Sequence, residues 1–69
     1  MKTSARNQFA GTIREIVKGP MSTEVTIEIA PGVRVVAMIS SRSAETLGLQ
    51  VSKPAHALIK ASSVIVAVD

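Results

Sequence analysis

The sequence predicts an all-β fold with five short strands and one short helix. Three observations predict it. Nine Val and seven Ile stand against only three Leu, a balance that favours strands over helices. Apolar and polar residues alternate with a period of two over several segments, and Pro or Gly separates these segments.

Residues 9–17 predict the first strand. Its alternation is imperfect, and Gly11 within it indicates either a β-bulge or a close approach of another backbone. Gly19 and Pro20 follow and predict a turn, because Gly permits unusual backbone angles and Pro lacks a donor.

Residues 23–30 show the cleanest strand pattern. Val25 and Ile27 share one face with Ile29, while the residues between them are Glu and Thr, so this strand has one face in water. A Pro-Gly pair then supplies a hairpin turn, and residues 33–40 return as the next strand.

The period of two is lost over residues 41–49. Ser41 or Ser43 is a candidate helix cap and Gly48 a candidate stop, which predicts one or two helical turns. A connector leads to Pro54, which is tolerated at the start of a strand because its missing N–H is not needed there.

Residues 55–61 and 63–68 predict the last two strands, with a bend between them. Five short strands with one small helix are typical of a small OB-like β-barrel, the oligonucleotide/oligosaccharide-binding type, or of a related sandwich. We therefore expect one OB-like domain over residues 1–69.

Two pairs of polar residues have the same chemistry. Lys60 and Ser62 share one face of a predicted strand, and Ser4 and Arg6 would share a face if their segment is extended. Ser, Arg, Lys and backbone N–H groups offer only donors and positive charge, which suits an oxyanion and requires no metal ion. The simpler interpretation is a Lys at a strand end that reaches into water.

Several motifs together resemble the molbindins, a family of small molybdate- and tungstate-binding proteins also called molybdenum-pterin-binding proteins. The resemblance covers essentially the whole chain, although Ser52, Pro54 and His56 depart from the usual pattern. The motifs that carry it are S-A-R-N-Q at 4–8, Gly11, I-E-I-A-P-G at 27–32, I-S at 39–40, L-G-L at 47–49 and I-K-A-S-S-V at 59–64.

The resemblance implies a single molbindin-like module that binds molybdate or tungstate in the cytoplasm, for storage and homeostasis of molybdenum. It also implies a homohexamer, a trimer of dimers, with oxyanion sites between subunits. The residues that it assigns to oxyanion binding are Ser4, Arg6, Lys60 and Ser62, with the backbone N–H groups of Ala5 and Ala61, and Ser40 in addition.

Composition agrees with an oligomer. A chain of 69 residues buries a modest core, and without Cys and with one His it has neither a disulfide nor an ordinary zinc site to stabilise it. The net charge of +3 would give an assembly a field that gathers anions. No signal peptide or membrane-spanning run is apparent, so a cytoplasmic location is expected and no membrane partner.

Other function classes fit less well. One His and scattered acids do not provide an activated nucleophile or an acid and base pair, so an enzyme is not expected. Single-strand nucleic-acid binding is the main alternative, but Phe9 is the only aromatic residue and such proteins use several for stacking. Binding of a pterin meets the same objection, and a purely structural assembly module is the remaining alternative.

Overall fold

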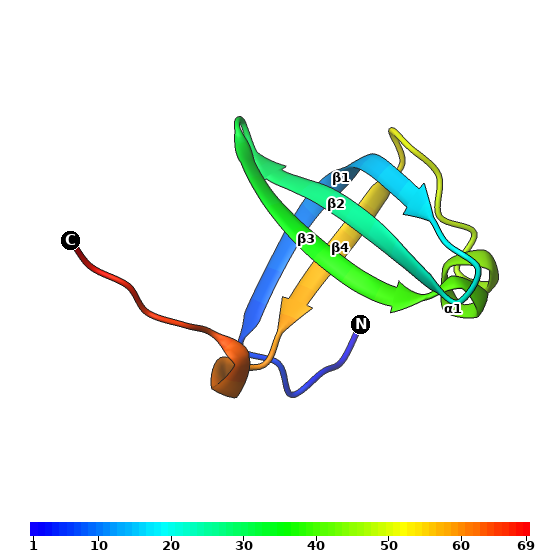
Figure 1. The fold of residues 1–69 in the computed structure, drawn as a ribbon. Coiled ribbons are helices and arrows are strands. Elements are labelled where there is room, and N and C mark those ends of the chain that lie inside the picture. The colour runs from blue at the N-terminus through cyan, green and yellow to red at the C-terminus, as the bar shows by residue number, and fades with distance from the viewer.

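The computed structural model describes residues 1–69 and contains one antiparallel sheet. Its four strands lie in the order β3-β2-β1-β4. Figure 1 shows the sheet strongly curled, with the helix at one end and the C-terminal segment directed away from the body. The elements are β1 (Asn7–Lys18), β2 (Ser22–Ala30), β3 (Val33–Ser40), α1 (Ser41–Thr46), β4 (Pro54–Ile59) and a 3-10 turn, η1 (Ala61–Ser63).

The core is formed by residues of β1, β2 and β4. Its buried apolar residues are Ile13, Val25, Ile27 and Ala57, with Ile13 only 1% exposed. Ile13 and Ile27 are register partners on β1 and β2, and Val25 and Ile27 are buried as the alternation over residues 23–30 predicts. The prediction that the opposite face of this strand lies in water is wrong, because Thr26 on that face is only 8% exposed.

The predicted fifth strand over residues 63–68 is wrong for this chain. Residues 61–63 form the turn η1, and residues 64–69 have no regular structure. A strand needs a neighbour for its N–H and C=O groups, and the sheet leaves β3 and β4 as unpaired edges instead of a closed barrel. The architecture is mostly β with one short helix, as predicted, but the closed five-stranded barrel is not formed.

Gly11 marks a close approach of two backbones. A Cβ atom at this position would lie 2.5 Å from the carbonyl oxygen of Glu28 on β2. The bulge in β1 occurs two positions further along, where the register with β2 shifts between Ile13 and Glu15. Of the two interpretations of Gly11, close approach is therefore the one that the structure confirms.

A partly buried hydroxyl pair attaches the start of α1 to the turn between β1 and β2. The Ser41 hydroxyl donates to the carbonyl of Gly19 at 2.7 Å and lies 2.7 Å from the hydroxyl of Thr23, which is 1% exposed. Because Ser41 has one proton and uses it on Gly19, Thr23 is the donor in the second bond.

Ser41→Ala is expected to lower the free energy of unfolding by about 1–3 kcal/mol, because a buried Thr23 donor and the Gly19 acceptor both lose their partner. Chemical denaturation of the variant and the wild type measures this change. Ser43→Ala is the matched control, since its hydroxyl bond to Ser40 is exposed, and a change within about 0.5 kcal/mol is expected. Equal losses in both variants would contradict the structural role of Ser41.

The one α-helix spans only six residues, and no helix is long and apolar enough to cross a membrane.

Candidate functional site

The two predicted donor pairs lie at the same edge of the sheet. β1 begins at Asn7 and the antiparallel β4 ends at Ile59, and these two residues are register partners. Arg6 and Lys60 are the next residues outward, one on each chain segment, so the β1·β4 pairing delivers both cations to one place.

A shallow pocket of about 250 Å³ is formed there, and five of the seven predicted site residues line it, all except Ala5 and Ser40. The segments are not extended strands, because the chain bends at Ser4 and Arg6 and turns at η1. Each side of the pocket nevertheless presents one Ser and one cationic side chain. The lining residues are Ser4, Arg6, Lys60, Ala61 and Ser62.

The pocket carries two positive charges and no carboxylate among its lining residues. Neither Arg6 nor Lys60 forms a salt bridge, since the two in the protein join Arg14 and Arg34 to Glu28. Like charges on adjacent segments repel each other, and an anion between them would relieve that repulsion. The electrostatics therefore favour an anionic ligand.

Backbone donors differ on the two sides of the pocket. On the η1 side, the Ser63 N–H donates to the Lys60 carbonyl at 2.8 Å and closes the turn. The N–H groups at the start of such a turn have no partner within it. On the other side, Ala5 N–H donates to the Thr3 hydroxyl at 3.1 Å. A ligand that used the Ala5 N–H would have to replace this hydroxyl.

Ser40 does not join this group. Its hydroxyl caps α1, accepting from Ser43 N–H at 3.1 Å and donating to the Ser43 hydroxyl at 2.8 Å. In Figure 1, α1 lies at the end of the sheet away from η1. The Ser that ends β3 is thus engaged as a helix cap, which is a common use of this residue type.

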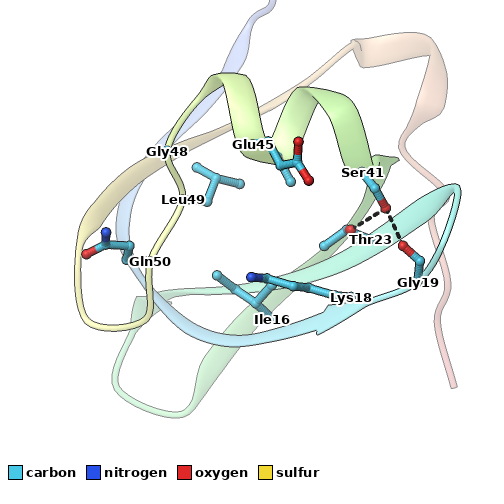
Figure 2. Close-up of a pocket in the computed structure, with 10 residues that line it drawn as sticks. Ile16, Lys18, Gly19, Thr23, Ser41, Glu45, Gly48, Leu49 and Gln50 are labelled. Carbon is cyan, nitrogen blue, oxygen red and sulfur yellow. Dashed lines mark hydrogen bonds between the residues drawn. The ribbon is translucent and has the colours of Figure 1, made fainter.

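A second pocket of about 290 Å³ lies between α1 and the sheet and was not anticipated from the sequence. Figure 2 shows Lys18 and Glu45 on opposite sides of it, with the Ser41 and Thr23 hydroxyls beside the turn. A carboxylate in the lining makes this pocket less suited to a dianion than the first. Its residues come from three separate segments, 16–19, 23 and 41–50, which the sequence pattern alone does not bring together.

The protein contains no group of three or more His, Cys, Asp or Glu residues that could hold a metal ion. The pocket between residues 4–6 and 60–62 is lined by two cations and two hydroxyls, with no carboxylate.

The family model of the TOBE domain matches residues 3–66. Among curated proteins, a molybdenum transport protein ModE from Herbaspirillum seropedicae is 48% identical over all 69 residues of this chain, which span 26% of that protein. The chain thus covers about a quarter of that relative's length. A probable molybdenum-pterin-binding protein from Haemophilus influenzae is 41% identical, and the match covers both chains completely.

Two solved structures share the fold. MopII from Clostridium pasteurianum has a TM-score of 0.90 and 34% identity, with coverage of 97% of this chain and 100% of that one. A molybdate-binding protein from Sporomusa ovata has a TM-score of 0.89 and 34% identity, with coverage of 97% and 98%. The similarity in sequence and in structure extends over nearly the whole chain.

Proposed function

The chain belongs to the TOBE domain family, and on that premise we propose that it binds molybdate or tungstate rather than catalysing a reaction. The observation that carries the proposal is a pocket with two cations, two hydroxyls and no acid. Relatives named as molybdenum-pterin-binding and molybdate-binding proteins support the choice of ligand. Storage of molybdenum in the cytoplasm is part of the proposal and follows from the family resemblance.

The ligand fits the pocket by its hydrogen-bonding character. Molybdate and tungstate are tetrahedral dianions near neutral pH, so each oxygen only accepts. Arg6 and Lys60 supply charge-assisted bonds, and Ser4 and Ser62 supply neutral ones. The N–H groups of Ala5 and Ala61 complete the proposed donor set, with the Ala5 N–H released from Thr3.

We place these sites between subunits of a homo-oligomer, a hexamer according to the resemblance. The two segments that line the pocket are exposed to solvent, so a neighbouring subunit can cover it. The C-terminal segment supports an assembly, because Ile65 and Val66 are 92% and 85% exposed while β3 and β4 are unpaired edges. We propose that residues 64–69 are covered by a second copy.

Val66→Pro is expected to shift the protein towards smaller species, because proline removes an N–H donor from a segment that must pair to be covered. Light scattering at micromolar concentration measures the mass. Val66→Thr is the matched control, since it keeps the β-branched shape and the N–H, and its mass should equal that of the wild type. A wild-type protein that is a stable folded monomer would contradict the assembly.

Anion selectivity tests the donor chemistry directly. Calorimetric titration at pH 7 should give similar affinities for molybdate and tungstate, which are nearly equal in size and charge. Sulfate should bind more weakly, because it is smaller and fits loosely between the Ser4–Arg6 and Lys60–Ser62 segments.

Phosphate should bind most weakly of the four anions. Much of it carries a hydroxyl at pH 7, whose proton meets another donor, and a mismatched polar group costs about 1–3 kcal/mol, a tenfold to hundredfold loss of affinity. Phosphate that binds as tightly as molybdate would refute the proposal of a donor-only site. A short oligonucleotide titrated into the same preparation checks the nucleic-acid alternative, and no heat of binding is expected.

A further inference from the structure

Two side-chain amides bond the chain segments that carry the pocket residues, without lining the pocket themselves. The Asn7 amide nitrogen donates to the carbonyl of Ile59 at 3.2 Å, and the Gln8 amide nitrogen donates to the carbonyl of Ala5 at 2.7 Å. Neither Asn7 nor Gln8 is among the residues that line the pocket. Both bonds end on backbone atoms of the segments that carry the pocket donors.

The Asn7 bond joins the two sides of the pocket. Asn7 is the first residue of β1 and Ile59 the last of β4, so this pair is the final rung of the ladder before Arg6 and Lys60 diverge. A terminal rung next to two like charges tends to fray, because β4 is an edge strand and the cations repel each other. A partly buried side-chain bond at this rung opposes the fraying.

The Gln8 bond fixes the direction of one side. The chain bends at Ser4 and Arg6 before β1, and nothing in the sheet ladder constrains residues before Asn7. Gln8 reaches back to the Ala5 carbonyl between those bends, so the hydroxyl of Ser4 and the guanidinium of Arg6 start from a defined backbone. The Asn7 amide thus holds the two sides of the pocket together, and the Gln8 amide orients the side that carries Ser4 and Arg6.

We infer that Asn7 and Gln8 are positioning residues, which set the distance between the Ser4–Arg6 and Lys60–Ser62 segments and thereby the size of oxyanion that the pocket accepts. The inference rests on the proposed function of this pocket. A residue that only orients a group in contact with the ligand changes affinity by about tenfold or more when it is removed, because the donors then sample geometries that do not fit.

The test uses Asn7→Leu and Gln8→Met, which keep side-chain size and remove the amide donor. Calorimetric titration with molybdate and with sulfate is expected to show an affinity for molybdate that is about tenfold lower in each variant. The preference for molybdate over sulfate should also shrink. Without the amide, the Ser4–Arg6 and Lys60–Ser62 segments can adopt other distances from each other, including ones that suit the smaller anion. Gln50→Met, which removes an exposed amide that makes no side-chain hydrogen bond, is the matched control and should match the wild type.

The selectivity ratio separates positioning from general destabilisation. Loss of folded protein lowers the apparent affinity for both anions by the same factor, so an unchanged ratio in both variants would overturn the inference, as would unchanged affinities. The Gln8→Met result decides the matter if Asn7→Leu folds poorly, because Gln8 is exposed. A wild-type protein that binds neither anion would overturn the proposed function itself, and with it this inference.

Discussion

Replacement of Arg6 or Lys60 by methionine is expected to lower the affinity for molybdate by about tenfold to a hundredfold for each cation removed, since a hydrogen bond to a charged group contributes about 1.5–3 kcal/mol. The fold should persist, because both residues are exposed and neither forms a salt bridge. Stability without ligand should be unchanged or higher, because the remaining cation is no longer repelled. Calorimetry with molybdate and thermal unfolding measure the two effects.

Arg42→Met is the control with the same change in net charge. Arg42 lies on α1, outside the pocket, so the variant loses the same long-range attraction for anions but none of the direct bonds. Its affinity should stay close to that of the wild type. An equal loss in Arg42→Met and in the two pocket variants would show that net charge, and not the pocket, binds the anion.

Gly11→Ala is expected to lower the free energy of unfolding substantially. The added Cβ would lie 2.5 Å from the Glu28 carbonyl oxygen and 2.8 Å from Ile27 Cγ2, so β1 and β2 must move apart beside the core. Overpacking of this kind costs about 1–3 kcal/mol, and here the nearest atom is a backbone carbonyl oxygen, which cannot rotate away. Denaturant unfolding of the variant measures the loss.

Gly32→Ala provides the comparison. Gly32 has a φ of +74° in the turn between β2 and β3, but a Cβ there would meet nothing within 4 Å. The expected cost is that of the backbone conformation alone, about 1 kcal/mol. A smaller loss for Gly11→Ala than for Gly32→Ala would contradict the close approach of β1 to β2.

The central strand β2 could be predicted from the sequence because apolar and polar residues alternate along it. Val25 and Ile27 are buried as this alternation predicts, but the opposite face is not in water, since Thr26 is buried and Glu24 and Glu28 are half-buried. The segment 63–68 has the same β-branched composition, yet it forms no strand in this chain. Composition indicates a tendency to pair, whereas pairing depends on a neighbour that the sequence does not identify.

The residues of the pocket could be predicted, but not their arrangement. Two serine and cation pairs suggested an oxyanion, and the family resemblance gave them a common role. That they meet depends on the Asn7 to Ile59 register, a contact between residues 52 positions apart. The sequence likewise does not reveal that Ser40 caps α1 or that the Ala5 N–H donates to the Thr3 hydroxyl. In both cases a local hydrogen bond uses a group that was assigned to the ligand.

The central claim is that an oxyanion binds between residues 4–6 and 60–62. A crystal of the protein grown with tungstate tests it most directly, because tungsten scatters anomalously and its position can be located without reference to the protein. The expected result is an anomalous peak within hydrogen-bonding distance of the Ser4 and Ser62 hydroxyls and of the Arg6 and Lys60 side chains. A fully occupied tungstate at the pocket beneath α1, with none among these four residues, would contradict the claim.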